Sequence, residues 1–318
     1  MTAVGIALGL LGLVCGLAGF SYAAARLIEA IAPPQGGFLD VDGQRLHVFD
    51  KGSGPPVVLI HGLSGQMGNF LHSLAARLSD DFRVLAFDRP GSGYSTRAPG
   101  APAGLRAQAA TLANAMRRLK LDKPVVVGHS LGGAVALALA LDHPDCAGAL
   151  ALIAPLTRPV RKPPLVFQAL AISSPLVRRL GAWTVATPGG LLFRNLSARE
   201  VFAPEAPPAD FGVAGGGLLS LRPRNLEEAS ADVVAINDDL EPMTARYSEI
   251  GVPVGVLYGR GDRLLDPLAQ GASLKRGLPS LDLEIVDGGH MLPVTQPVLC
   301  AAFIRRIAAK AGAASARR

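Results

Sequence analysis

Cysteine is scarce in this chain of 318 residues, which contains only Cys15, Cys146 and Cys300. Three widely separated cysteines form neither a disulfide framework nor a cluster of metal ligands. The sequence therefore predicts no metal site, and its cysteines do not indicate a cellular compartment.

Charged residues are also few, at 18% of the chain against 49% hydrophobic residues, and they give a net charge of +6. Many of the positive charges lie in the second half and at the C-terminal end. They are not interleaved with aromatic residues as in a nucleic-acid-binding surface, so we expect no nucleic-acid partner. A basic soluble surface and attraction to anionic lipid are both compatible with this charge.

A long stretch without any charge lies near the N-terminus, from Val4 to Ala25. As a helix, these 22 residues would span about 33 Å, close to the hydrocarbon thickness of a bilayer. We therefore expect residues 1–32 to form a transmembrane or signal-anchor helix with its linker, so that one helix holds the protein at a membrane. The alternatives are a cleaved secretory signal, although no Lys or Arg precedes the apolar stretch, and a buried helix of the globular fold.

The charges that flank this segment bear on its orientation. Arg26, Arg45 and Lys51 all lie on its C-terminal side. Such a flank favours a cytoplasmic globular domain, whereas cleavage of the segment would give a secreted or periplasmic protein. The bias is small, and the side of the membrane stays open.

Beyond the linker, short apolar runs alternate with helical patterns, after a hairpin signal at Asp42-Gly43. The runs expected as buried parallel strands are 57–60, 84–87, 125–127, 150–153, 254–258 and 283–286. The helical patterns cover 69–78, 105–119, 131–141, 267–276 and 297–309. This alternation predicts an α/β fold with a mostly parallel eight-stranded sheet and helices on both faces.

The alternation stops between Leu156 and Ile250, where no strand pattern occurs. About ninety residues is too long for a structureless loop inside a compact domain, so we expect an inserted helical cap at 157–250. The core is then divided into residues 33–156 and 251–310, and residues 311–318 form a basic tail.

Residues 128–132 read G-H-S-L-G and lie directly between an expected strand and an expected helix. A serine on such a turn takes a strained backbone conformation that lifts its hydroxyl clear of the sheet. The positions two residues away on either side must be small, and both are glycine. The N-terminus of the helix adds a positive dipole beside the hydroxyl. Ser130 is therefore the candidate nucleophile.

From about Phe38 to Ala309 the chain resembles the α/β-hydrolase family, and within it the capped esterases, lipases and C–C hydrolases. In that family the nucleophile, the acid and the histidine follow one another along the chain. Only His143 and His290 follow Ser130. His143 lies at the far end of the same expected helix, about 20 Å away, so the resemblance implies His290 as the base.

The resemblance places the acid at the end of a strand that precedes the histidine. Asp262 ends the turn G-R-G-D at residues 259–262, which directly follows the apolar run at 254–258, whereas the family's other location, after the preceding strand, offers no carboxylate. Asp262 is therefore predicted to orient the imidazole. Asp266 is the alternative, and Asp238 and Asp239 are expected to be solvated charges of the cap.

A second turn, H-G-L-S-G at residues 61–65, resembles the family's His-Gly turn after its third strand. The resemblance implies that the backbone N–H groups of Leu63 and Leu131 stabilise the oxyanion that develops during catalysis. His61 is expected to hold this loop in place. The glycine-containing turn at 88–95 also resembles the family and is expected to support the fold.

A serine nucleophile with a histidine base predicts acyl transfer to water through an acyl-enzyme, with no metal and no organic cofactor. Serine at position 130 argues against the haloalkane dehalogenases and epoxide hydrolases of this fold, which have aspartate there. An apolar cap suits a small hydrophobic ester as the substrate. The same triad is compatible with a C–C bond hydrolase, an amidase or a cofactor-free haloperoxidase. A catalytically silent binding or scaffold protein is the alternative from another class, and the oligomeric state stays open.

Overall fold

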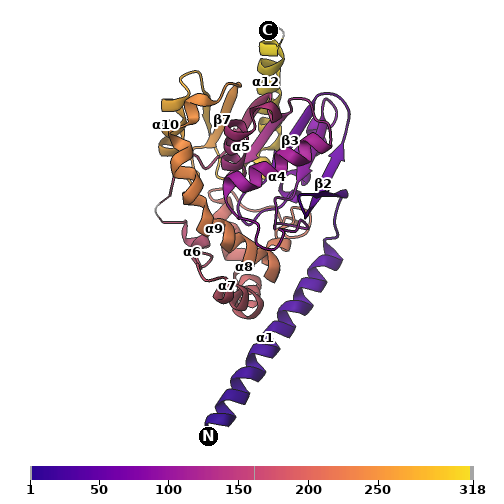
Figure 1. Ribbon diagram of the computed structural model, residues 1–318, viewed down its shortest axis with the longest axis vertical. Helices are drawn as coiled ribbons and strands as arrows, with labels where there is room; N and C mark the ends of the chain where they lie inside the picture. The colour runs from indigo at the N-terminus through magenta and orange to yellow at the C-terminus, as the bar shows by residue number, and fades with distance from the viewer. Residues whose placement is uncertain (1, 161, 316–318) are drawn as a thin grey trace.

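The computed structural model describes residues 2–160 and 162–315, and one sheet organises its globular part (Figure 1). The strands are β1 (Gly37–Val41), β2 (Gln44–Lys51), β3 (Pro56–Ile60), β4 (Arg83–Phe87), β5 (Val125–His129), β6 (Ala149–Ile153), β7 (Val254–Gly259) and β8 (Asp282–Val286). Their order is β1-β2-β4-β3-β5-β6-β7-β8. β1 pairs with β2 and β2 with β4 in antiparallel ladders, and the other pairs are parallel. The predicted α/β fold with a mostly parallel eight-stranded sheet is confirmed.

Both faces of the sheet are buried, which explains the continuous apolar runs of its parallel strands. Along β3, Val58 and Ile60 face one hydrophobic core, and Val57 and Leu59 face the other. The first core is covered by α4 (Leu105–Arg118), α5 (Leu131–Asp142) and α10 (Pro267–Gly277). The second is covered by α2 (Gly68–Leu71), α3 (Leu74–Leu78), α11 (Leu292–Thr295) and α12 (Pro297–Ser315).

Two segments differ from the sequence-based expectation. The single helix expected at 69–78 is divided into α2 and α3, because Ser73 (φ −159°, ψ −25°) leaves the helical conformation and takes the N-terminal cap position of α3. At the C-terminus, α12 continues to Ser315, so residues 311–315 of the expected tail are helical. That segment is rich in alanine, the strongest helix former. Residues 316–318 of the expected tail lie outside the described residues.

Between β6 and β7 the described part of the chain forms helices and no strand. The α-helices are α6 (Leu165–Gln168), α7 (Pro175–Gly181), α8 (Thr187–Phe202) and α9 (Pro223–Thr244). The short elements are the π-helical turn η2 (Ala182–Ala186) and the 3-10 turns η3 (Leu219–Leu221) and η4 (Tyr247–Glu249); a further 3-10 turn, η1 (Pro144–Cys146), precedes β6. The α-helices lie together at one end of the sheet and form the expected cap (Figure 1).

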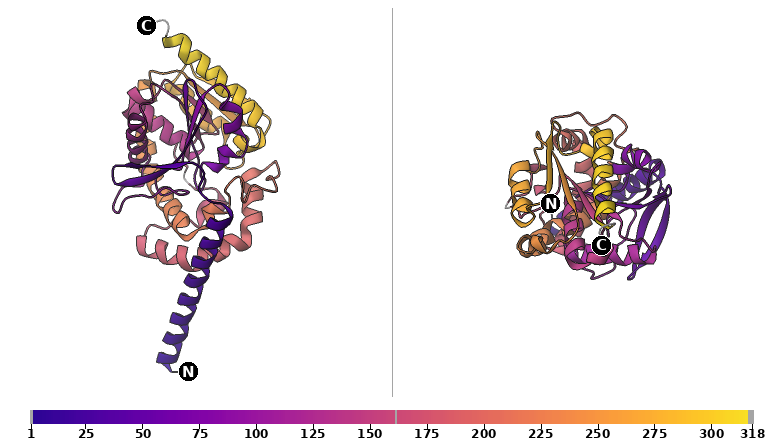
Figure 2. Two further views of the ribbon diagram at one scale, coloured as in Figure 1. Left: turned by 90° about the vertical axis from the view of Figure 1, so that its right-hand side faces the viewer. Right: turned by 90° about the horizontal axis from the view of Figure 1, so that it is seen from above.

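The N-terminal helix, α1 (Ala3–Ile31), is long and apolar enough to cross a membrane by length and composition. Its residues up to Gly16 are exposed and project away from the globular part (Figure 2). Its second half contacts η2, α8, η3 and α9 of the cap. Ser21 and Ile28 are buried on this face, seven positions apart, as one side of a helix requires.

Hydrophobic and polar contacts fix the end of α1. Ile28 and Ala32 form a small hydrophobic core with Leu219 of the cap. Glu29 lies 2.8 Å from Arg222 in an ion pair, and the Tyr94 hydroxyl donates to the carbonyl oxygen of residue 32 at 2.6 Å. The N-terminal segment and the globular part, which were expected to be divided at residue 32, are therefore packed against each other.

Candidate active site

Ser130 lies on the sharp turn between β5 and α5, with φ 54° and ψ −121°. A positive φ is rare for a residue with a side chain and stores strain of about 1–3 kcal/mol. The turn is also tight. A Cβ at Gly128 would lie 2.5 Å from the backbone oxygen of Gly132, and one at Gly132 would lie 2.1 Å from that of Ile60. Glycine is therefore required on both sides of Ser130, as inferred from the motif.

The loops after β7 and β8 bring Asp262 and His290 together. Nδ1 of His290 lies 2.7 Å from Oδ2 of Asp262, and both side chains are almost fully buried. The backbone N–H groups of Leu264 and Leu265 donate to Oδ1 of Asp262 at 2.8 and 3.0 Å. Burial would raise the pKa of Asp262, but His290 and these two N–H groups outweigh it and lower the pKa. The ionised carboxylate accepts the proton on Nδ1, which leaves Nε2 as the basic nitrogen of His290.

The other candidates from the sequence are held elsewhere. Asp266 caps α10 by accepting two N–H groups of its first turn. Asp239 accepts the backbone N–H of Arg106, and Asp238 is exposed. His143 stands at the C-terminal end of α5. Among the described residues, Asp262 is thus the carboxylate in contact with His290.

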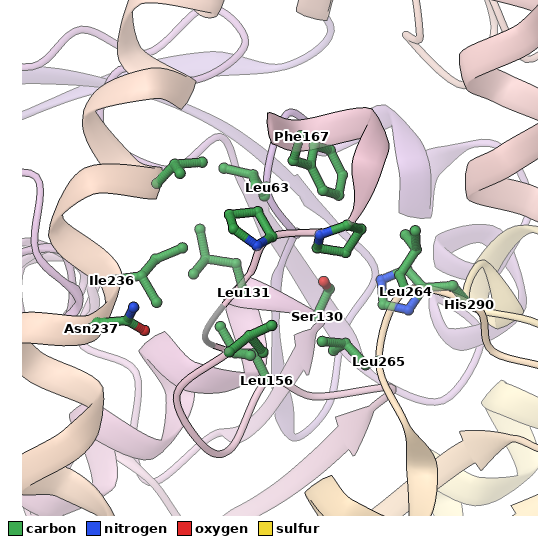
Figure 3. Close-up of a pocket in the computed structure, with 14 residues that line it drawn as sticks. Leu63, Ser130, Leu131, Leu156, Phe167, Ile236, Asn237, Leu264, Leu265 and His290 are labelled. Atoms are coloured by element: carbon green, nitrogen blue, oxygen red, sulfur yellow. The ribbon is translucent and has the colours of Figure 1, made fainter. Parts of the chain in front are cut away.

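Ser130 and His290 line the same pocket, and Figure 3 shows both side chains at its wall. The part next to them has a volume of about 80 Å³, and its other lining residues are apolar except Asn237. A larger cavity of about 930 Å³ lies under the cap and shares Leu63, Ser130 and His290 with the smaller part. The serine hydroxyl therefore lies where a small apolar space meets a large one.

The loop after β3 runs directly beside the serine. A Cβ at Gly62 would lie 2.9 Å from the Cβ of Ser130, and the next residue, Leu63, borders the pocket. Leu131 begins α5, where the first N–H groups of a helix lack an intrahelical acceptor and carry partial positive charge. In the part of the chain that is described, the backbone N–H groups of Leu63 and Leu131 donate to no acceptor. Leu63 and Leu131, each with a free backbone N–H, thus line the same pocket as Ser130.

Two fully buried histidines hold the loops of the site. His129 donates from Nε2 to the carbonyl oxygen of His290 at 3.0 Å. His61 donates from Nδ1 to the carbonyl oxygen of Gly62 at 2.8 Å and accepts the N–H of Arg89 at 3.0 Å. Burial, helped by neighbouring charges, lowers the pKa of each of the two histidines to about 3. Both imidazoles are therefore neutral and fix the backbone around the pocket.

A buried arginine joins the site to the cap. Arg89 donates from Nε to the carbonyl oxygen of His61 at 3.0 Å and from Nη2 to that of Gly62 at 2.9 Å. Its Nη1 lies 2.8 Å from Asp232 on α9. One guanidinium thus holds both the loop that carries Leu63 and a helix of the cap. The sequence predicted only a tight turn at residues 88–95. It did not predict the contact between Arg89 and Asp232, because these two residues are 143 positions apart.

A carboxylate of the cap also supports the loop of His290. Glu205 accepts the backbone N–H of Gly289 at 2.8 Å and the hydroxyl of Thr295 at 3.1 Å. Glu205 and Gly289 are 84 positions apart, so no local pattern points to this pair. The cap therefore contacts the loop that carries Leu63 and the loop that carries His290, in addition to covering the cavity.

Comparison with known proteins identifies the family. The model of the alpha/beta hydrolase fold family matches residues 55–297, and the chain belongs to this family. This agrees with the resemblance inferred from the sequence motifs and with the sheet order described above. The protein is therefore a member of the hydrolases of the α/β fold.

Several known proteins are similar to this chain in sequence or in fold. The magnesium-chelatase 30 kDa subunit of Rhodobacter capsulatus is 30% identical over 256 residues, which are 77% of this chain and 84% of that protein. A thermophilic esterase from Thermogutta terrifontis is 25% identical, with a TM-score of 0.71 over 87% of this chain and 99% of the esterase. The enol-lactonase of Burkholderia xenovorans LB400 shares the fold, at 23% identity and a TM-score of 0.69 over 86% and 100% of the two chains.

Proposed function

We propose that this protein is a membrane-anchored serine esterase that hydrolyses a hydrophobic carboxylic ester with Ser130, His290 and Asp262 as its catalytic triad. The observation that carries the proposal is the convergence of separate loops on one apolar pocket. The strained serine turn and the buried histidine–carboxylate pair meet there, beside the free N–H groups of Leu63 and Leu131.

The first half of the reaction transfers the acyl group to the enzyme. The Ser130 Oγ attacks the ester carbonyl carbon while Nε2 of His290 takes the hydroxyl proton. The carbonyl oxygen becomes negative, and the N–H groups of Leu63 and Leu131 stabilise it. Asp262 keeps the proton on Nδ1 and stabilises the imidazolium. The C–O bond then breaks, the histidine gives its proton to the leaving alcohol, and the acyl group stays on the serine.

The second half returns the enzyme to its starting state. Water enters the place of the alcohol, and Nε2 of His290 takes one of its protons as the oxygen attacks the acyl carbon. The same two N–H groups stabilise the second oxyanion. When the bond to Ser130 breaks, the serine oxygen takes the proton from the histidine and the carboxylic acid leaves.

The shape and lining of the pocket support a hydrophobic substrate. The larger cavity, at about 930 Å³, is at the upper end of the usual range for small-molecule sites. The smaller space has only Ser130, His290 and Asn237 as polar lining residues. An ester with one long apolar arm and one short arm fits this pair of spaces. The esterase name of the Thermogutta relative supports an ester over an amide or a C–C bond.

The contacts of α1 support a retained anchor over a cleaved signal. The small residues at 21–25 are the segment where a signal peptidase would cut. The face of α1 that packs on the cap begins before the end of this segment, at Ser21, and continues to Ile28. Cleavage after residue 25 would therefore remove part of a packed face, which argues that the helix remains attached.

A fluorophosphonate probe tests the nucleophile on the full chain in detergent micelles. We expect the probe to label the protein and its Ser248→Ala variant, which changes an exposed serine, and to leave Ser130→Ala unlabelled. We also expect turnover of p-nitrophenyl esters of graded chain length, with a preference for medium or long acyl chains.

The other outcomes separate the alternatives. Labelling without ester turnover would keep Ser130 as the nucleophile and direct the search to amides, C–C bonds or peroxide-dependent halogenation. Absence of labelling in protein that is folded by circular dichroism would contradict the proposed nucleophile. That result would favour a binding or scaffold protein on the same fold.

A further inference from the structure

The cap exposes an unusual number of large apolar side chains to solvent. Seven of them, on α7, η2 and α8, are between 53% and 76% exposed: Leu176, Val177, Leu180, Val185, Leu192, Phe193 and Leu196. These elements follow one another without a gap from Pro175 to Phe202, and η2 contacts both α7 and α8. Contiguous apolar surface of this kind marks an interaction site. We call these seven residues the apolar cap face.

Positive charge accompanies the apolar cap face. The segment from Leu165 to Phe202 contains four arginines and one glutamate. Arg179, Arg194 and Arg199 are exposed among the leucines. This mixture matches an anionic lipid surface, because apolar side chains enter the headgroup and acyl boundary while arginines stay at the phosphates.

The position of α1 brings the same face to a bilayer. In Figures 1 and 2, α7 and α8 lie at the end of the globular part from which α1 projects. The free part of α1, from Ala3 to Gly16, has 14 residues and is about 21 Å long, whereas the hydrocarbon core is about 30 Å thick. The remaining 9 Å or so must come from the part of α1 that is packed on the cap. The cap beside it therefore sits within the lipid interface, at a depth typical of interfacial helices.

The apolar cap face is also a wall of the cavity. Val185 and Phe193 belong to the face and line the cavity of about 930 Å³ as well. Ser130 and His290 line the same cavity. An apolar molecule that leaves the lipid at this face would thus reach the serine without crossing water.

From these observations we propose that the apolar cap face is immersed in the interface of the membrane that α1 spans. The substrate is then a long-chain ester dissolved in that bilayer, and it enters the cavity directly from the lipid. The part of this inference that concerns the ester rests on the proposed function. The part that concerns immersion rests on the apolar cap face and on the proposed anchoring by α1, and it does not depend on the esterase activity.

Trp183, the only tryptophan of the chain, lies in η2 and reports on immersion without any assay of activity. The full chain is reconstituted in vesicles of phosphatidylcholine and phosphatidylglycerol, with or without bromine on the acyl chains. We expect brominated lipid to reduce the tryptophan emission about twofold, as for an interfacial side chain. The double variant Leu176→Glu/Leu196→Glu should lose most of this quenching. Leu268→Glu, a change of a leucine that is 73% exposed on α10, should keep it.

Activity in the same vesicles tests the route. We compare a long-chain ester dissolved in the bilayer with p-nitrophenyl acetate in the water. The double variant should lose about tenfold in turnover of the lipid-dissolved ester and keep turnover of the acetate, because only the first substrate needs the immersed face. None of its substituted residues lines the pocket. Leu192→Glu, at a position that is 75% exposed, serves as a second variant if the double one does not fold.

Three results would contradict the inference or separate it from the proposed function. Unquenched Trp183 in vesicles would show that the cap faces water. A wild-type dimer in detergent that the double variant converts to a monomer would assign the face to a second copy of the chain. Quenching in vesicles without turnover of either ester would support immersion and contradict the esterase proposal, so that the two failures are distinguishable.

Discussion

The buried ion pair between core and cap allows a quantitative prediction. Arg89 and Asp232 have side chains that are 0% and 1% exposed, with their charged atoms 2.8 Å apart. Asp232 also lies 2.6 Å from Arg97, which keeps a second acidic partner, Glu228, at 3.2 Å. The substitution Asp232→Asn preserves the shape of the side chain and removes its charge. It therefore leaves one buried guanidinium without a counter-ion, which costs about 3–5 kcal/mol.

Chemical unfolding of the full chain in detergent micelles measures this cost. The control is Asp145→Asn, which breaks a pair with Arg117 whose side chains are 61% and 44% exposed. An exposed pair contributes at most about 1 kcal/mol, so the control should be nearly as stable as the wild type. Equal stability losses in the two variants would refute the reasoning about burial.

The same variant should affect turnover, because Arg89 also holds the carbonyl oxygens of His61 and Gly62. A looser loop would misplace the N–H of Leu63, which is proposed to stabilise the oxyanion and not the bound ester. We therefore expect kcat to fall more than KM changes. A change confined to KM would argue against a link between the cap and this loop.

Further predictions concern the pocket and the loops around it. Asp262→Asn should reduce kcat/KM by about 10³–10⁴-fold, since the imidazole loses its tautomer and orientation; unchanged ester hydrolysis would contradict the assigned acid. His61 and His129 have pKa values lowered to about 3 in the folded protein. At a pH below the ordinary histidine pKa of about 6.5, each of these side chains therefore takes up a proton when the protein unfolds. Stability should be full above about pH 6.5 and should fall toward pH 3, by up to about 1.4 kcal/mol per pH unit for each histidine; equal unfolding midpoints at pH 7 and pH 5 would exclude this. Gly132→Ala should abolish fluorophosphonate labelling, because its Cβ would lie 2.1 Å from a backbone oxygen of β3, whereas Gly9→Ala, with open space around it, should label normally.

The elements predicted from the sequence are those with a local signal. The apolar run at 57–60 became β3, and the G-x-S-x-G turn lies between β5 and α5 as expected. The pairing of Asp262 with His290 was expected from the resemblance to the α/β-hydrolase family, and loops at one end of parallel strands can meet in this way. The break at Ser73 was missed because its sequence keeps a helical pattern on both sides.

What could not be predicted depends on contacts between distant segments. The hydrogen bond between Gly289 and Glu205 and the ion pair between Arg89 and Asp232 have no pattern in the sequence, because their partners meet only after the cap has packed on the core. For the same reason, the uncharged run at Val4–Ala25 predicted an apolar helix at the N-terminus but neither the continuation of α1 to Ile31 nor the docking of its second half.

The docking of α1 on the cap has a consequence for biosynthesis. Glu29 leaves the ribosome long before its partner Arg222, from which it is separated by 193 positions. At elongation rates of about 5–20 residues per second, the helix waits about 10–40 s for the cap. If α1 is inserted in a bilayer as proposed above, the lipid supplies the apolar environment that the side of α1 facing the future cap needs during this time. The membrane would then first cover the apolar side of α1 during synthesis and later anchor the folded protein.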